Sequence, residues 1–396
     1  MISKFGVKNF VSFKDGIEVN FEFDGKVPES VKLGRDISPV LGVKGANGSG
    51  KTNIIKAIEF ISKFCSRSAE LDVDEEIPID TFFQSEEPSQ FYIEFEADGR
   101  KYFYELELVR EKVIREEIYR KKDRKVPVLK RSYNKISYSI RELSELKKIK
   151  IKSNSSIISL FRKYDFKSEM TDLTILNDFF YDIITNVTSL GYVDIDLSYK
   201  EISEMYAQDE RLFGFVKNVL MQSDSGIKDI FIEKRKDNEG KDVYFPIFLH
   251  AHESKSFFLT IHDESSGTKA LFVKMAMYWT VLMSGGVLAL DEFDIHLHAM
   301  VLPLIVNLFI SKDVNKFDAQ LIFTAHNTEI IDCLGKYRTI LVNKEDCESY
   351  CYRLDEISGS MIRNDRPISP IYLDGKIGGT PLNLTWEDVG EVVDEV

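Results

Sequence analysis

Three short apolar runs, each ending in polar residues, stand out in the hydrophobic pattern of the chain. They cover residues 40–43, 286–290 and 321–323. Apolar runs of this length without alternation are typical of strands that are buried on both faces, as in the parallel sheets of α/β proteins. The pattern therefore predicts three core strands and an α/β fold.

Alternating and helical patterns predict the elements around these core strands. Alternation, or a high content of aromatic and β-branched residues, predicts further strands over 16–23, 91–96, 101–108, 227–232 and 243–249. The second and third of these strands form a hairpin around an Asp-Gly turn. Strand character continues weakly to about residue 138. The spacing then becomes helical from about 140 to 207 and again over 211–221.

The change from strand to helical patterns indicates an insertion in the main domain. At 396 residues the chain is long for one compact domain, so a second lobe is expected. We predict a head built from residues 1–109 and 226–396, with a mainly helical arm or lid inserted at 110–225.

The first core strand leads into the segment 45–52, GANGSGKT, which fits G-x-x-x-x-G-K-[ST] at every fixed position. A strand, loop and helix of this kind is a P-loop: backbone N–H groups turn toward phosphate oxygens, and the helix N-terminus adds positive partial charge. We expect Lys51 to reach the β- and γ-phosphates of ATP and Thr52 to hold Mg²⁺. The predicted nucleotide-binding residues here are Asn47, Gly48, Ser49, Gly50, Lys51, Thr52 and Asn53.

Two carboxylates follow the second core strand. Asp291 and Glu292 end a wholly apolar and therefore buried strand, so they face something that needs charge. In a P-loop enzyme the first carboxylate assists Mg²⁺ and the second orients and polarises the attacking water. We expect Asp291 at the metal site and Glu292, together with Lys51, in a catalytic role.

The third core strand ends in His326, and a Ser-Ser-Gly turn at 265–267 opens the apolar helix 270–279. A histidine on the strand after the acids can contact the γ-phosphate and sense its loss, so we predict a catalytic role for His326. The serine turn can bind an anion by the same physics as the P-loop, although serine also commonly caps helices.

Charge is distributed unevenly along the chain. The formal net charge of −13 argues against binding of nucleic acid by the whole surface. The segment 110–152 nevertheless carries sixteen basic and six acidic side chains. This excess fits either a solvated, salt-bridged arm or a surface for nucleic acid or an acidic partner.

No apolar stretch approaches the roughly 18 residues that a membrane span needs, and the first residues lack the apolar core of a signal peptide. The four cysteines form no disulfide framework. Cys347 and Cys351 have no second ligand pair nearby, so thiols are expected rather than a zinc site. These observations predict a cytoplasmic protein without a membrane partner.

The order of these motifs resembles the ABC-type ATPase heads of the SMC and RecF-like group. Lys51 and Asp291 lie 240 residues apart, farther than an AAA+ module would place them. More narrowly, the chain looks like the single-chain AAA-type ATPases of bacterial phage-defence and abortive-infection systems, which often work beside a nuclease or another toxic effector. The segments that carry the resemblance are 2–13, 45–52, 264–269, 291–298, 324–326 and 375–381.

The resemblance implies that Ser265 and Gly267 bind the γ-phosphate of ATP held by a second subunit. It thus implies a head-to-tail homodimer with ATP between the subunits, or a larger oligomer built on that dimer. Two departures bear on communication between the sites: the signature reads Ser-Ser-Gly-Thr, and Asp294 and His298 stand where a Pro and an Asp are expected. For the glutamine of the lid the candidate is Gln84, with Gln90 as its rival.

The leading hypothesis is a regulatory ATPase that dimerises around ATP and controls an effector, a nuclease or toxin encoded nearby, in anti-phage defence. The alternative is a DNA-repair or chromosome-associated ATPase that clamps DNA, with nucleic acid bound through 110–152. A transporter subunit is disfavoured by the long charged insertion. A self-contained nuclease would need more than the Asp194-x-Asp196 pair.

Overall fold

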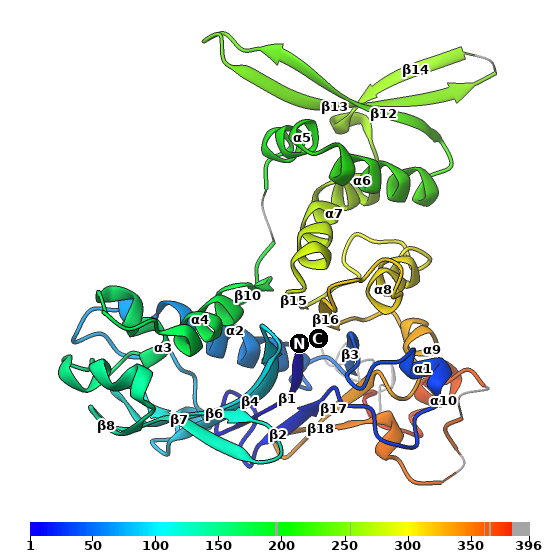
Figure 1. The fold of residues 1–396 in the computed structure, drawn as a ribbon. Helices are drawn as coiled ribbons and strands as arrows, with labels where there is room; N and C mark the ends of the chain where they lie inside the picture. The colour runs from blue at the N-terminus through cyan, green and yellow to red at the C-terminus, as the bar shows by residue number, and fades with distance from the viewer. Residues whose placement is uncertain (195–196, 254, 360, 364–365, 382–396) are drawn as a thin grey trace, which may run out of the picture.

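The computed structural model describes all residues except 195–196, 254, 360, 364–365 and 382–396 (Figure 1). Its centre is a six-stranded mixed sheet in the order β18-β17-β3-β16-β15-β9. The strands are β3 (Val40–Gly45), β9 (Ile183–Thr185), β15 (Val287–Leu290), β16 (Gln320–Thr324), β17 (Thr339–Glu345) and β18 (Glu348–Arg353). All neighbours are parallel except β17 and β18. The three predicted core strands are confirmed as β3, β15 and β16.

A second, seven-stranded sheet is antiparallel throughout, in the order β2-β1-β4-β5-β6-β7-β8. Its strands are β1 (Ile2–Lys8), β2 (Ile17–Asn20), β4 (Ser89–Ala97), β5 (Arg100–Val109), β6 (Lys112–Lys121), β7 (Lys125–Ser132) and β8 (Lys135–Ser139). The predicted hairpin over 91–96 and 101–108 is confirmed as β4 and β5.

The first part of the predicted arm differs from a mainly helical insertion. Residues 112–139 form β6, β7 and β8, which extend the second sheet. Bulges shift the register between β5 and β6, between β6 and β7, and between β7 and β8. These shifts break the two-residue alternation by which strands are recognised in a sequence. The domain bounds 1–109, 110–225 and 226–396 stay a prediction.

Helix α2 (Lys51–Arg67) joins the two sheets into one core. Its apolar residues belong to the same buried cluster as Ile93 and Phe95 of the antiparallel sheet and Ala289 and Ile322 of the mixed sheet. The smaller helices of this part are α1 (Glu29–Lys32), α3 (Ile157–Leu160), α4 (Thr171–Tyr181), α8 (Leu302–Ile310), α9 (Ile330–Leu334) and α10 (Ser369–Leu373). The helix that carries the P-loop is therefore fixed by apolar burial on both sides.

A separate part of the molecule rises above the two sheets in Figure 1. It consists of helices α5 (Tyr199–Gln208), α6 (Glu210–Ser223) and α7 (Ser266–Ser284) and strands β12 (Ile227–Lys236), β13 (Asp242–His252) and β14 (Lys255–Thr260). These strands form an antiparallel sheet at the tip, and α7 runs back from it toward β15. A two-stranded ladder of β10 (Val187–Thr188) and β11 (Gly191–Tyr192) lies below. Among the described residues, no helix is long and apolar enough to cross a membrane.

A fully buried ion pair ties the antiparallel sheet to the helices beside it. Arg131 on β7 lies 3.0 Å from Glu116 on β6, and neither side chain is exposed. Glu116 also accepts hydrogen bonds from the Tyr104 hydroxyl at 3.1 Å and from the backbone N–H of Ile157 at 3.0 Å. Arg131 donates to the carbonyl oxygen of Lys152 at 2.7 Å. Both members of the pair thus have hydrogen-bond partners in addition to each other, as buried charges require.

We predict that Arg131→Met lowers the free energy of unfolding by about 3–5 kcal/mol, because it leaves the Glu116 carboxylate buried without its charge partner. Urea denaturation followed by circular dichroism measures the change. The control is Arg115→Met on the same sheet, whose half-exposed ion pair with Glu107 should be worth at most about 1 kcal/mol. Equal losses from the two substitutions would contradict the prediction.

Candidate nucleotide-binding site

The polar residues that follow the three core strands meet at one edge of the mixed sheet. Strands β3, β16 and β15 are parallel neighbours, with Val43 beside Thr324 and Phe323 beside Leu290. Their carboxyl ends therefore lie side by side. In open α/β sheets this edge is where ligands bind.

The P-loop has the backbone conformation that phosphate binding requires. Gly50 adopts φ of 104°, and a Cβ atom there would lie 2.6 Å from the Ser349 hydroxyl. Only glycine fits this position without strain. Helix α2 begins at the next residue, and no side chain caps its N-terminus among the described residues. The first N–H groups of α2 are thus available to an anion.

Two features of the P-loop fit a triphosphate. The Ser49 hydroxyl is buried and has no hydrogen-bond partner in the part of the chain that the structure describes. The Lys51 ammonium donates to the carbonyl oxygens of Gly45 and Ala46, each at 2.9 Å, and so lies over the loop. Burial lowers the pKa of Lys51, and the carboxylates of Asp291 and Glu292 oppose that shift.

Asp291 and Thr52 form an oxygen donor set suited to Mg²⁺. The Thr52 hydroxyl donates to Asp291 Oδ2 at 2.9 Å, although the two residues lie in distant parts of the chain. The other carboxylate oxygen of Asp291 accepts from the Thr324 hydroxyl at 2.6 Å. Hydroxyl and carboxylate oxygens are the ligands that Mg²⁺ prefers. The structure thus brings together the two residues predicted to hold the metal.

Asn186 and Thr324 hold in place the acidic turn, which is the pair Asp291-Glu292 after β15. The Asn186 side chain accepts from the Asp291 N–H at 2.7 Å and donates to the Asp291 carbonyl oxygen at 2.8 Å. The backbone N–H of Glu292 donates to the Thr324 hydroxyl at 2.9 Å. Sequence reasoning gave neither residue a role, although Thr324 belongs to the segment 324–326 that carries the family resemblance. The signal that could have indicated them is their position at the carboxyl end of a strand: Thr324 ends β16, and Asn186 directly follows β9.

Glu292 has a strained backbone. Its φ is 48°, in the left-handed region that costs an ordinary residue about 1–2 kcal/mol. The hydrogen bond to Thr324 and a second one from the Phe293 N–H to the Thr324 carbonyl oxygen, 2.9 Å long, fix this conformation. Such strain is found where a side chain must be held for function.

His326 is exposed at the same edge, just after β16. Its backbone N–H and that of Asn327 donate to one carboxylate oxygen of Asp294, at 2.8 and 2.6 Å. Asp294 therefore binds the backbone of the segment around His326, which we call the histidine segment (325–327).

The Ser-Ser-Gly turn lies at the start of α7, where the Ser265 side chain caps the helix by accepting from the Thr268 N–H at 3.1 Å. Ser265 and Ser266 are exposed. Within the described residues, no hydrogen bond joins this turn to the P-loop of the same chain. Gly267 faces the loop after β15, since a Cβ atom there would lie 3.4 Å from the His296 carbonyl oxygen.

Gln84 lies on an exposed turn beside the first loop of the chain. The N–H of Phe82, in the same turn, donates to the Asn9 side chain at 3.2 Å. The next residues of that first loop reach the P-loop helix, because the Asn53 amide donates to the Ser12 hydroxyl at 2.7 Å. Gln90 is exposed on β4. The choice between Gln84 and Gln90 stays a prediction.

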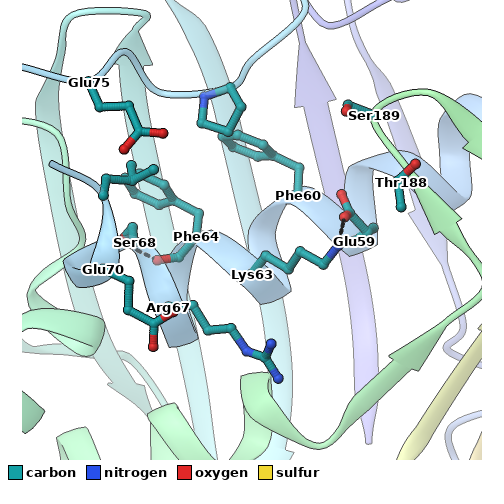
Figure 2. A pocket seen from close by; sticks show the side chains of 12 residues that line it. Glu59, Phe60, Lys63, Phe64, Arg67, Ser68, Glu70, Glu75, Thr188 and Ser189 are labelled. Atoms are coloured by element: carbon teal, nitrogen blue, oxygen red, sulfur yellow. Dashed lines mark hydrogen bonds and ion pairs between the residues drawn. The ribbon is translucent and has the colours of Figure 1, made fainter.

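Figure 2 shows a different hollow, of about 400 Å³, on the side of α2 and toward its far end. Phe60 and Phe64 line it together with polar side chains, and Lys63 forms an ion pair with Glu59 at 2.5 Å. None of the predicted nucleotide-binding residues lines this hollow. A hollow of about 640 Å³ adjoins the P-loop itself and includes Lys44, Asn47 and His326 in its lining.

Comparisons with known proteins bear on the fold and the family of the chain. No curated protein matches the chain. A solved structure described as "Crystal structure of the SmcHead bound to the C-winged helix domain of ScpA" is 16% identical, covers 90% of this chain and 99% of its own, and has a TM-score of 0.51. A second structure, "SMC head domain from Thermotoga maritima", is 15% identical, covers 89% of this chain and 98% of its own, and has a TM-score of 0.44.

The first of these similarities shows the fold: the chain has the mixed α/β architecture of an SMC head, as the sequence predicts. A family model described as "AAA domain, putative AbiEii toxin, Type IV TA system" matches residues 40–332. That range includes the P-loop, the serine turn, the acidic turn and the histidine segment. The chain therefore belongs to this family of AAA domains.

Proposed function

We propose that the protein binds ATP with Mg²⁺ at the edge of the mixed sheet and hydrolyses it. The observation that carries this proposal is the 2.9 Å contact between Thr52 of the P-loop and Asp291, with Glu292 next to it. Membership of the AAA family supports it. The P-loop amides and Lys51 bind the phosphates, and Thr52 and Asp291 hold the metal ion.

The remaining residues of this edge act on the γ-phosphate. Mg²⁺ held by Thr52 and Asp291 would supply positive charge that stabilises the negative charge of the phosphate groups. Glu292 orients the attacking water and accepts its proton. Lys51 stabilises the charge that develops on the transferred phosphoryl group, and His326 contacts the same group.

A second copy of the chain completes each site. Ser265 is exposed and Gly267 is half-buried at the N-terminus of α7, and neither makes a hydrogen bond to the P-loop of its own chain in the described part of the structure. A helix N-terminus that carries an exposed serine is suited to an anion. In a symmetric dimer the N-terminus of α7 would meet the γ-phosphate bound by the other copy. ATP would therefore stabilise the dimer, and hydrolysis would let the two copies separate.

The biological role that we propose is control of an effector, a nuclease or toxin, during infection. The family description, which names a putative toxin and a toxin–antitoxin system, supports this role. The alternative, a DNA clamp, draws on the basic segment 110–152. There, Arg115, Arg120, Lys121, Lys130 and Arg131 form ion pairs with carboxylates. The salt-bridged interpretation of the segment therefore applies to these five of its sixteen basic residues.

The first test of the proposed function is Glu292→Gln. We expect turnover of ATP to fall by about 100-fold or more, because the general base is removed. ATP should still bind, and light scattering should show a dimer with ATP and a monomer without it. The control Glu239→Gln, on an exposed hairpin turn, should behave as wild type. A monomer that persists with ATP would refute the shared site.

The second test distinguishes composite sites from sites within one chain. Lys51→Ala and Ser265→Arg should each abolish hydrolysis. In an equal mixture, half of the dimers contain both variants, and each of these has one intact site, so about a quarter of wild-type activity should return.

The matched control for this mixing experiment combines Lys51→Ala with Glu292→Gln. Both of these residues belong to the P-loop side of the site, so no mixed dimer has an intact site and activity should stay absent. Recovery in both mixtures, or in neither, would contradict the composite site.

A further inference from the structure

Lys44 is a buried lysine directly before the P-loop, and sequence reasoning gave it no role. Its side chain belongs to β3, and the residue is only 2% exposed. The ammonium donates to three consecutive carbonyl oxygens, those of Ala325, His326 and Asn327, at 2.8, 2.8 and 3.0 Å. An ammonium has three hydrogens, so this short segment satisfies all of them.

Asp294 binds the same segment through its N–H groups. One of its carboxylate oxygens accepts from the backbone of His326 and Asn327. Asp294 follows β15 and Lys44 belongs to β3, and these strands are the two neighbours of β16 in the sheet. The backbone of the segment after β16 is therefore bound from both neighbouring strands, while the imidazole of His326 is left exposed.

We propose that Lys44 and Asp294 are positioning residues that hold the segment Ala325–Asn327 so that His326 meets the γ-phosphate. This inference rests on the proposed ATPase function and names a coupling within it. The strand that leads into the P-loop and the turn that follows β15 each contact this segment through one charged side chain. A displacement of either element moves the histidine, and the histidine is fixed only when both elements are in place.

The charges around Lys44 make this arrangement sensitive to pH. Burial lowers the pKa of Lys44 to about 8, while the Asp294 carboxylate raises it and the Lys51 ammonium lowers it further. The Tyr372 ring lies 5.7 Å from Nζ, and Asp374 lines the same hollow. Above this pKa a neutral amine keeps two N–H donors, so one of the three bonds to the segment is lost.

The sign of the pH effect follows from this change. The ammonium form predominates below about pH 8 and is lost as the pH rises through that value. The pH dependence of kcat/KM reports the free enzyme, so kcat/KM should fall above about pH 8. Bound triphosphate favours the ammonium and raises its pKa, so the fall in kcat should come at higher pH.

The experiment compares wild type with Lys44→Met, Lys44→Arg and Asp294→Asn, and uses Lys8→Met, at the exposed last residue of β1, as the matched control. For Lys44→Met we expect kcat to fall about tenfold with KM for ATP changed less than about twofold, because the lost interaction acts on a transition-state contact. The fall in kcat/KM above pH 8 should be absent in this variant. Lys44→Arg, which stays protonated, should recover part of kcat and lack the same fall.

Hydrogen exchange without nucleotide separates this inference from the ATPase proposal. The amides of His326 and Asn327 should exchange slowly in wild type and in Lys8→Met, and faster in Lys44→Met and Asp294→Asn. If the exchange rates behave in this way but wild type does not hydrolyse ATP, Lys44 and Asp294 do hold the segment and the proposed ATPase function is wrong. If wild type hydrolyses ATP while Lys44→Met keeps its kcat, pH profile and exchange rates, the inference is overturned.

Discussion

The site depends on one constraint of the mixed sheet: β3, β16 and β15 are parallel neighbours and end at the same edge. Each strand is buried on both faces, so its first polar residue can leave the core only where the strand ends. The contact between Thr52 and Asp291 exists because this geometry closes a gap of 239 residues in the chain. Without the shared edge, the P-loop and the acidic turn would be separate polar loops.

Hydrogen bonds between side chains and the backbone, rather than apolar packing, hold the residues of this edge in position. Asn186 binds the N–H and the carbonyl oxygen of Asp291, and Thr324 binds the N–H of Glu292. Such bonds keep a residue in the left-handed region at Glu292, which an isolated peptide would leave. The segment of His326 follows the same rule, with Lys44 and Asp294 as its partners. The residues expected to act on the nucleotide are therefore oriented by a surrounding set of polar side chains.

The sequence predicts the three core strands, the P-loop and the acidic turn, because each combines a buried apolar run with a short motif. It does not predict Asn186, since β9 has only three residues and lies in a segment with helical spacing. The strands over 112–139 give only a weak strand pattern, because bulges and charged residues interrupt the alternation. In the sequence, Lys44 is a single charged residue at the end of an apolar strand, and nothing near it indicates a partner. Its partners are three carbonyl oxygens 281 to 283 residues away, and they come within hydrogen-bond distance only because β16 lies beside β3.

The same edge concentrates charge that the fold alone does not need. Lys44, Lys51 and Asp291 are buried, and Glu292 and Asp294 lie beside them. Burial disfavours the charged forms of both lysines, as their lowered pKa values show. A well-packed apolar edge would be at least as stable, because the interactions within such charged groups only partly offset their loss of hydration. The fold therefore holds these charges at a cost in stability, and a triphosphate with a divalent ion is the kind of ligand that would offset that cost.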